Sequence, residues 1–289
     1  MSTDLFAHRN LSCSRARATS LLVLGLAACA GGAPECQVVA SARLPAALRE
    51  ASGVAVDGAG RTWAHADSGE PLLFQVDDDG RIVQELRVPG VRVQDWEDLA
   101  IGACPAGECF YIGDIGDNLH ERAHGVILRV PVPPDGVEGA SAIERFRIRY
   151  PDGPSDAEAL AVTGDGSVLV VTKGRNRAVS VYRYPAPLSP DSVRTLEHVQ
   201  NLTEGLVQVP QQITGGSASG QRVVLRSYSA LHVYEWTGDS LAVAGPPIDI
   251  RFLAEQQGEG VALDADGTTI VVGEGQGSGT LARLRCDGP

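Results

Sequence analysis

Short apolar runs alternate with polar turns along most of the chain, and these runs recur as pairs joined by a turn that contains glycine. One such pair extends from Ser52 to Asp67, and its first and last residues are 15 positions apart. A longer copy extends from Glu97 to Asp114, with two additional residues in its turn. Three further copies with the spacing of the first run from Glu158 to Lys173, from Gln212 to Ser227 and from Glu259 to Glu274. Two short apolar runs joined in this way predict a β-hairpin, so the sequence predicts five hairpins of one design.

A third apolar run follows every hairpin, and a fourth follows the first four copies, at residues 82–88, 143–150, 193–199 and 241–250. The last copy lacks a fourth run, but residues 37–44, near the start of the chain, form an apolar run with no hairpin of its own. Four-stranded units repeated around an axis are typical of a β-propeller. We therefore predict an all-β fold, a five-bladed β-propeller over residues 36–289 that is closed by its N-terminal strand. A six-bladed propeller with one unrecognised blade and a β-sandwich are the alternatives, and residues 44–49 are the only short helical candidate.

The first residues have the pattern of an export signal. Two arginines precede an apolar run at 21–26, and small residues then lead to Cys29. The order Leu-Ala-Ala-Cys resembles the bacterial lipobox, in which the cysteine is lipidated and becomes the mature N-terminus. We expect residues 1–28 to be a lipoprotein signal peptide and residues 29–35 to be a lipidated tether, with palmitate among the acyl chains that anchor the exported protein to a bacterial cell-envelope membrane. A plain secretory signal with a chance cysteine is the alternative.

Four cysteines remain when the leader and Cys29 are set aside. An even number of cysteines in an oxidising compartment predicts two disulfides. Cys104 and Cys109 flank a four-residue turn and can close the tip of a hairpin. Cys36 and Cys286 lie at opposite ends of the domain, and we pair them because the closing strand would lie beside the last run of the fifth copy.

The charge of the chain limits its partners. The formal net charge is −12, and because residues 1–28 carry a net charge of +2, the remainder carries −14. Such a surface repels phosphate backbones and anionic headgroups, so we expect no nucleic acid partner and no membrane contact other than the lipid anchor. We expect a monomer. A cation-binding face is the more specific explanation of the acidity, and solubility alone is the other.

Polar residues stand at aligned positions of the five copies. The innermost strand of a blade begins, and its second strand ends, at the same face of the ring because the two are antiparallel. These residues therefore converge on one mouth of the central channel. The residues that begin the hairpins are Ser52, Glu97, Glu158, Gln212 and Glu259, and those that end them are Asp67, Asp114, Lys173, Ser227 and Glu274.

The carboxylates of this mouth are candidate metal ligands. Crowded carboxylates repel one another unless a cation neutralises some of them, and hard oxygen ligands in this number suit Ca²⁺. The expected metal ligands are Glu97, Asp67, Asp114, Asp117 and Asn118. The residues expected to bind a small polar or anionic molecule beside the metal are Lys173, Arg226, Glu158, Glu259, Glu274 and Tyr228. A hydrated, ion-paired channel rim is the alternative.

The segment from Tyr111 to Asn118 is the most distinctive stretch of the chain. Three motifs make the chain resemble a group of bacterial exported propeller lipoproteins of unassigned activity. They are Trp-Glu-Asp-Leu-Ala at 96–100, Gly-Asp-Ile-Gly-Asp-Asn at 113–118 with Arg122 soon after, and Asp-Ala-Glu-Ala-Leu at 156–160. The resemblance spans roughly residues 45–285. More distantly, the chain is similar to propellers described as phytase-like or esterase-like, in which Ca²⁺ and acidic residues hold a phosphate. No catalytic residue of those proteins is carried over to this chain.

One zinc motif is present and has the wrong context. Residues 120–124, His-Glu-Arg-Ala-His, fit H-E-x-x-H, which binds zinc from one face of a helix. The short stretch between Asn118 and the apolar run at Val126 shows no helical pattern, and no third ligand follows. We expect a loop there in which Arg122 is the residue that matters.

Three functions are compatible with these patterns. The leading hypothesis is a cell-envelope lipoprotein that binds a small polar or anionic ligand, together with a divalent cation, at the acidic mouth of the channel. The second is a metal-dependent hydrolase of phosphate or carboxylic esters, in which Lys173 or Arg226 stabilises developing negative charge. The third is a protein-interaction scaffold that binds another envelope protein.

Overall fold

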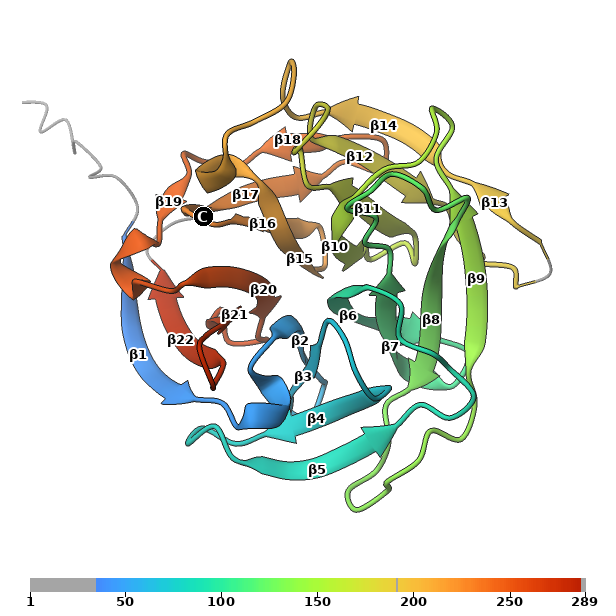
Figure 1. Ribbon diagram of the computed structural model, residues 1–289. Coiled ribbons are helices and arrows are strands. Elements are labelled where there is room, and N and C mark those ends of the chain that lie inside the picture. The colour runs from blue at the N-terminus through green and yellow to red at the C-terminus, as the bar shows by residue number, and fades with distance from the viewer. Residues whose placement is uncertain (1–34, 191, 287–289) are drawn as a thin grey trace, which may run out of the picture. The chain divides into compact units, whose positions relative to one another are not determined.

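Five sheets stand around a common axis, each with its innermost strand near the axis and its outermost strand at the rim (Figure 1). The computed structural model describes residues 35–190 and 192–286. Neighbouring innermost strands contact one another around the whole ring, from blade 1 to blade 5 and back to blade 1. The predicted five-bladed β-propeller is confirmed, and the six-bladed and sandwich alternatives are excluded.

The blades follow one another in chain order. Blade 1 consists of β2 (Ala51–Val56), β3 (Thr62–Ala66), β4 (Leu72–Val76) and β5 (Ile82–Arg87), and blade 2 of β6 (Trp96–Cys104), β7 (Gly107–Asp114), β8 (Gly125–Pro131) and β9 (Glu144–Arg149). Blade 3 consists of β10 (Ala157–Val162), β11 (Val168–Thr172), β12 (Ser180–Tyr184) and β14 (Glu197–Asn201), and blade 4 of β15 (Ile213–Ser219), β16 (Arg222–Ser227), β17 (Ala230–Trp236) and β18 (Leu241–Val243). Blade 5 consists of β20 (Gln257–Leu263), β21 (Thr269–Glu274), β22 (Thr280–Cys286) and β1 (Cys36–Arg43). The described helices are three short 3₁₀ turns, namely η1 (Ala46–Leu48), η2 (Val209–Gln211) and η3 (Arg251–Leu253).

The N-terminal strand closes the ring. β1 lies antiparallel to β22 as the outermost strand of blade 5, and Cys36 stands opposite Cys286 in this pairing. The two cysteines form a disulfide, and a second disulfide joins Cys104 and Cys109 at the tip of the β6–β7 hairpin. Both predicted disulfides are therefore confirmed.

The hydrophobic core is divided into five clusters, and each cluster lies between two neighbouring blades. Leu99 and Phe110 of blade 2 pack with Trp63 of blade 1, for example, and Leu160 of blade 3 packs with Tyr111 of blade 2. The remaining clusters fill the spaces between blades 3 and 4, 4 and 5, and 5 and 1. Because both faces of each sheet are covered, the inner strands of blades 1 and 3 are buried along their whole length, as propeller packing requires.

Two predicted outermost strands are divided in the structure. The run at 193–199 was expected in blade 3. Its last residues do lie there, in β14, but β13 (Arg194–Thr195) pairs in parallel with β9 of blade 2. Leu196, which follows it, is buried in the cluster between blades 2 and 3 and holds this segment against blade 2. The run at 241–250 is divided into β18 and β19 (Ile248–Asp249), because the intervening Pro246 and Pro247 have no N–H to donate.

The predicted leader at 1–28 and Cys29 lie outside the described residues, as does most of the tether at 29–35. Within residues 35–190 and 192–286, no helix has the length and apolar character needed to cross a membrane.

The two disulfides differ greatly in the length of chain that each one closes. Cys36 and Cys286 are 250 positions apart, whereas Cys104 and Cys109 are 5 apart. If disulfides act mainly by restricting the unfolded chain, removing the first pair by the double change Cys36→Ser, Cys286→Ser will lower the free energy of unfolding by about 5 kcal/mol. The matched change Cys104→Ser, Cys109→Ser will lower it by about 2 kcal/mol. Denaturant titration of both variants measures the difference, and equal losses would contradict this role of ring closure.

Candidate functional site

Each innermost strand carries an irregularity close to its first residue. The pairing with the second strand shifts there in every blade, as it does between Ala51 and Val54 in blade 1. A β-bulge of this kind turns a side chain away from the regular alternation. The polar residues at these five irregular positions are Ser52, Glu97, Glu158, Thr214 and Glu259.

The predicted alignment of these positions holds in four blades and is wrong in blade 4. Gly216 pairs with Leu225 as Val54 pairs with Ala64, so Thr214 and not Gln212 is the equivalent of Ser52. Gln212 precedes β15 at the end of η2. A shift of two residues leaves the same side chains on the same face of a strand, and for this reason the apolar pattern did not reveal it.

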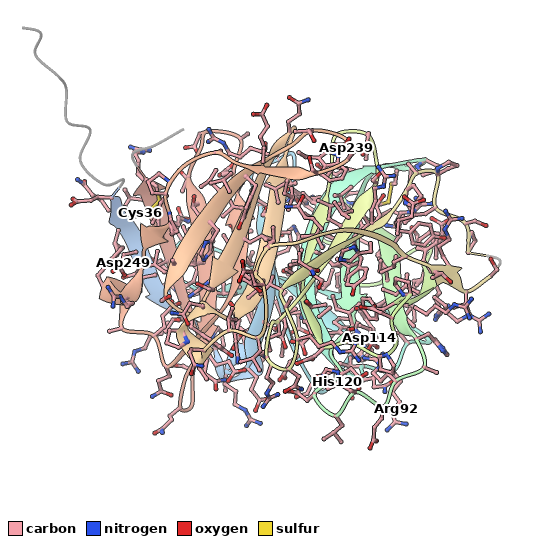
Figure 2. All side chains as sticks on the ribbon, turned by 90° about the horizontal axis from the view of Figure 1, so that it is seen from above. Cys36, Arg92, Asp114, His120, Asp239 and Asp249 are labelled. Atoms are coloured by element: carbon pink, nitrogen blue, oxygen red, sulfur yellow. A yellow bond between two sulfur atoms is a disulfide. The ribbon has the colours of Figure 1, made fainter. Side chains whose placement is uncertain are left out.

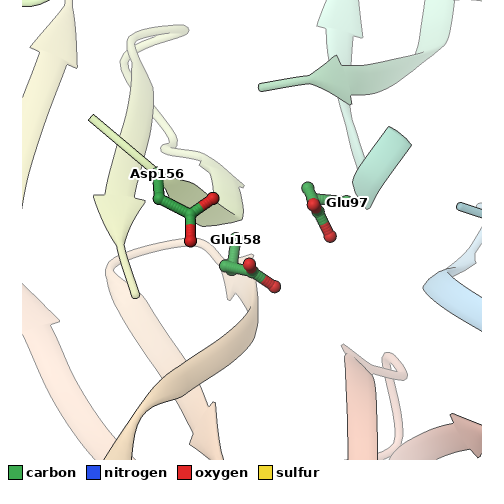
Figure 3. Close-up of side chains that lie close together, drawn as sticks. All are labelled: Glu97, Asp156 and Glu158. Carbon is green, nitrogen blue, oxygen red and sulfur yellow. The ribbon is translucent and has the colours of Figure 1, made fainter. Parts of the chain in front are cut away.

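Three carboxylates from blades 2 and 3 meet at this end of the channel (Figure 3). One oxygen each of Glu97, Asp156 and Glu158 lie within 4.8 Å of one another. The three residues are 7%, 3% and 1% exposed, respectively. Asp156 Oδ1 accepts a hydrogen bond of 2.9 Å from the backbone N–H of Asp117, but Asp156 Oδ2 is buried without any partner among the described residues. We call Glu97, Asp156 and Glu158 the carboxylate triad.

Lys173 provides one positive charge beside the triad. Its Nζ lies 2.6 Å from Glu158 Oε1, and the negative charge of Glu158 raises the pKa of Lys173 although burial of the ammonium group opposes this effect. Burial raises the pKa of Tyr228, and the negative charge of Glu259 raises it further. Lys173, Tyr228 and Glu259, which we predicted as ligand-binding residues, are therefore gathered at the same mouth as Glu158.

The carboxyl groups of the mouth hold their protons more tightly than exposed ones. Burial and then the charge of Glu158 raise the pKa of Glu97 well above its usual value. Burial raises the pKa of Glu158 to about 7, although the nearby Lys173 lowers it. Burial and the charge of Asp156 raise the pKa of Asp95 to about 6. More negative charge is concentrated here than Lys173 alone neutralises.

Two predicted metal ligands already have protein partners. Arg122 Nη2 lies 2.7 Å from Asp114 Oδ1, and Asp117 accepts hydrogen bonds from the backbone N–H groups of Glu121 and Arg122. Asp114 lies on the same face of the ring as His120, opposite Asp239 (Figure 2). Both carboxylates therefore bind residues of the loop that follows β7 and hold that loop in place.

The other predicted residues are distributed around the mouth. Asn118 accepts a hydrogen bond from Arg175 at the exposed surface. Asp67 follows β3 in blade 1 and is half-buried. Arg226 is fully buried, and its guanidinium donates to the carbonyls of Gly260 and Val272 and pairs with Glu255. Of the predicted metal ligands, only Glu97 lies in the triad.

Residues 115–124 form a loop, as we expected for the zinc-like motif. His120 has a positive φ of 56°, which is incompatible with a helix. Arg122 donates to the carbonyls of Gly116 and Asp114 and so ties the loop to the end of β7.

Asp98 is the important residue that we did not predict. Its carboxylate is fully buried and accepts backbone hydrogen bonds from Leu99, Leu160 and Gly216, which lie in blades 2, 3 and 4. Burial raises the pKa of Asp98 well above its usual value, although these three N–H donors lower it. An acidic residue inside the apolar run of an innermost strand was the available signal.

Comparison with known proteins supports the fold. No family model matches the sequence, and no curated protein matches it. A glutaminyl cyclase from Myxococcus xanthus is similar in structure, with a TM-score of 0.57, 13% identity, and coverage of 89% of this chain and 98% of that one. The PQQ-bound aldose sugar dehydrogenase from Streptomyces coelicolor has a TM-score of 0.50, 13% identity, and coverage of 88% and 98%. At this identity the likeness concerns the fold alone.

The raised pKa values predict how stability depends on pH without added metal. The folded state keeps protons on Glu158 up to a pKa of about 7, compared with 4.5 for an ordinary glutamate. Because the folded state binds more protons than the unfolded chain in this window, the free energy of unfolding will fall as the pH rises through it. In Glu97→Gln one buried charge is absent, so the fall will be smaller.

Urea titrations across this pH window measure the effect. Glu85→Gln is the matched control, because Glu85 is an exposed residue on the outermost strand of blade 1. A free energy of unfolding that rises with pH, or a fall that Glu97→Gln leaves unchanged, would argue against the carboxylate triad as its source.

Proposed function

We propose that this propeller binds a divalent cation, Ca²⁺, at the carboxylate triad and presents it to a small polar ligand at the mouth of the channel. The observation that carries the proposal is the unpartnered, buried Asp156 Oδ2 beside two further buried carboxylates. A buried ionic group without a partner is costly, and a bound cation removes this cost. The triad therefore has both the ligands and a reason to hold an ion.

The chemistry of the donors favours a hard cation. All three side chains offer carboxylate oxygen, which suits Ca²⁺, and the described residues of the triad include no histidine or thiolate of the kind that zinc prefers. Ca²⁺ takes six to eight oxygen ligands, so three side chains leave coordination positions for water or for an oxygen of the ligand. Asp95, next to the triad, is a further candidate ligand.

Lys173 and Tyr228 are the proposed contacts for the ligand of the metal. Lys173 is bound to Glu158, and a cation that draws the Glu158 carboxylate toward itself would release the ammonium group for an anionic or polar group. Arg226 is left out of the proposed site because both of its Nη atoms have protein acceptors.

Ester hydrolysis is the alternative use of the same residues. It requires a base beside the metal, and a carboxyl with a pKa of about 7, such as that of Glu158, has this property. In the proposed site Glu158 is itself a ligand of the cation and is not free to act as that base, so the geometry supports binding better than hydrolysis.

We also propose that the chain is an exported lipoprotein anchored through Cys29. The two disulfides support an oxidising compartment, because disulfides are rare where thiols are kept reduced. In this proposal the propeller is held close to a cell-envelope membrane by the tether that precedes β1.

Thermal melting tests the metal site. Treating the purified protein with EDTA and then adding Ca²⁺ in hundredfold excess over its Kd will restore about 2.7 kcal/mol of stability. For a domain of this size each kcal/mol corresponds to about 2–4 °C, so the melting temperature will rise by several degrees. Glu97→Gln and Asp156→Asn will abolish the rise, whereas Glu85→Gln will retain it. An unchanged melting temperature in EDTA and in excess Ca²⁺ would eliminate the proposed site.

Labelling with radioactive palmitate tests the anchor. When the chain is expressed in a Gram-negative host, the wild-type protein will incorporate the label and partition with membranes, and Cys29→Ser will do neither. Cys13→Ser, which changes a cysteine inside the predicted leader, is the control and will keep both properties. Label that persists in Cys29→Ser would show that this cysteine is not the acylated one.

A further inference from the structure

Two surface loops meet beside the carboxylate triad, one from blade 2 and one from blade 3. The blade 2 loop follows β7, and the blade 3 loop joins β11 to β12. Arg175 Nη1 donates a hydrogen bond to Asn118 Oδ1, and Asn176 Nδ2 lies 2.5 Å from His120 Nε2. The partners are 57 and 56 positions apart along the chain, so only the tertiary structure brings them together. We call Asn118, His120, Arg175 and Asn176 the clasp.

Both loops also contact the triad directly. In the blade 2 loop, the backbone N–H of Asp117 donates to Asp156 Oδ1 at 2.9 Å, and the other oxygen of Asp156 is the one without a partner. A Cβ on Gly116 would lie 2.1 Å from Glu97 Oε1, so the same loop passes against a second triad carboxylate. In the blade 3 loop, the backbone N–H of Lys173 donates to the carbonyl of Asp156 at 3.0 Å. Asp156 is therefore held by both loops that the clasp joins.

A small cavity separates the clasp from Asp156. It is lined by His120, Arg175 and Asn176 on the side of the clasp and by Asp156 on the other, and its volume is about 20 Å³. This volume holds about one water molecule, so the clasp lies close over the carboxylate. The two blade 3 residues of the clasp are exposed, whereas Asp156 is 3% exposed. The clasp is thus the outer layer, and Asp156 the inner layer, of one contact between blades 2 and 3.

The backbone of His120 has a conformation that depends on contacts with blade 3. Its φ of 56° lies in the left-handed region, which is uncommon for a residue with a side chain. A backbone of this kind persists where the surrounding contacts determine it. The ring of His120 has two such contacts, because Nδ1 lies 3.4 Å from the carbonyl oxygen of Pro154 and Nε2 faces Asn176. Both partners precede or follow strands of blade 3, so the blade 2 loop has this shape when it is docked on blade 3.

We infer that the clasp positions the metal site: it holds the blade 2 loop on Asp156 and so orients this carboxylate for the cation. The inference rests on the proposed function for the ion. Carboxylates that bind metals are oriented by hydrogen bonds from surrounding residues, and losing such a bond weakens metal binding. Without the clasp, the loop stays tied to blade 2 by Arg122, but the N–H of Asp117 can leave Asp156. Coupling of this kind is reciprocal, so the bound cation in turn stabilises the closed clasp.

Isothermal titration calorimetry of the purified, EDTA-treated protein with Ca²⁺ tests the effect on affinity. The double change Arg175→Ala, Asn176→Ala removes the blade 3 side chains of the clasp, and we expect it to weaken Ca²⁺ binding about tenfold. Arg177→Ala is the matched control and will bind Ca²⁺ as the wild type does, because Arg177 lies in the same loop but bonds to Asp152. The substituted residues are exposed, so the melting temperature in EDTA will stay close to that of the wild type.

Hydrogen exchange of residues 115–124 tests the clasp without any metal. In EDTA, we expect the backbone amides of this segment to exchange faster in the double variant than in the wild type and in Arg177→Ala. Added Ca²⁺ will slow their exchange in the wild type, because ion binding and closure of the clasp stabilise each other.

The two measurements separate this inference from the proposed function. Unchanged Ca²⁺ affinity in the double variant, an equal loss of affinity in Arg177→Ala, or unchanged exchange of 115–124 in the double variant would each overturn the inference. A wild-type protein that binds no Ca²⁺ would overturn the metal site. Faster exchange in the double variant would in that case still support the clasp as the group that holds the blade 2 loop on Asp156.

Discussion

The buried carboxylate of Asp98 links the innermost strands of three blades at the centre of the ring. It accepts backbone N–H groups from blades 2, 3 and 4 at distances of 2.7–2.9 Å and is wholly removed from solvent. Burying an acidic group is costly, and here the cost is offset by three hydrogen bonds that the strands cannot make to one another, because neighbouring innermost strands lie in different sheets. The Ser52 hydroxyl donates a hydrogen bond to the carbonyl of Glu97 and so links blade 1 to blade 2. The Thr214 hydroxyl donates to the carbonyl of Glu259 and so links blade 4 to blade 5.

This arrangement also places the candidate site. Glu97 precedes Asp98 in β6, and Glu158 is two residues before Leu160, whose N–H binds Asp98. The position of two triad carboxylates is thus fixed by the group that joins their strands. Where blades 5 and 1 meet, the backbones approach so closely that a Cβ on Gly260 would lie 2.4 Å from the carbonyl oxygen of Ser52. Stability and site geometry therefore depend on the same few residues, and a mutation at the axis would affect both.

The fold was largely predictable, and the site only in part. Five hairpins of nearly equal spacing, together with an unaccompanied strand at 37–44, were sufficient for the number of blades, the closing strand and the Cys36–Cys286 disulfide. The repeat also indicated which end of the strands carries the polar residues. It did not distinguish a carboxylate with one oxygen left without a partner, such as Asp156, from one that is bound by its own loop, such as Asp114. That difference depends on Arg122 and on backbone N–H groups whose positions are set by tertiary contacts. The role of Asp98 likewise could not be predicted from the sequence, because the most distant of its three N–H donors, Gly216, lies 118 positions away along the chain.

The disulfide of the closing strand has a mechanical consequence. Cys36 is the first residue of β1, so a pull that arrives through the preceding segment reaches the Cys36–Cys286 bond before it reaches any hydrogen bond between β1 and β22. Without this bond, the strand could be peeled away one residue at a time from its exposed end. With it, tension bypasses β1 and is delivered to β22, which has β21 on its other side. The pairing between β1 and β22, which closes the ring, is thereby protected from tension applied to the N-terminus.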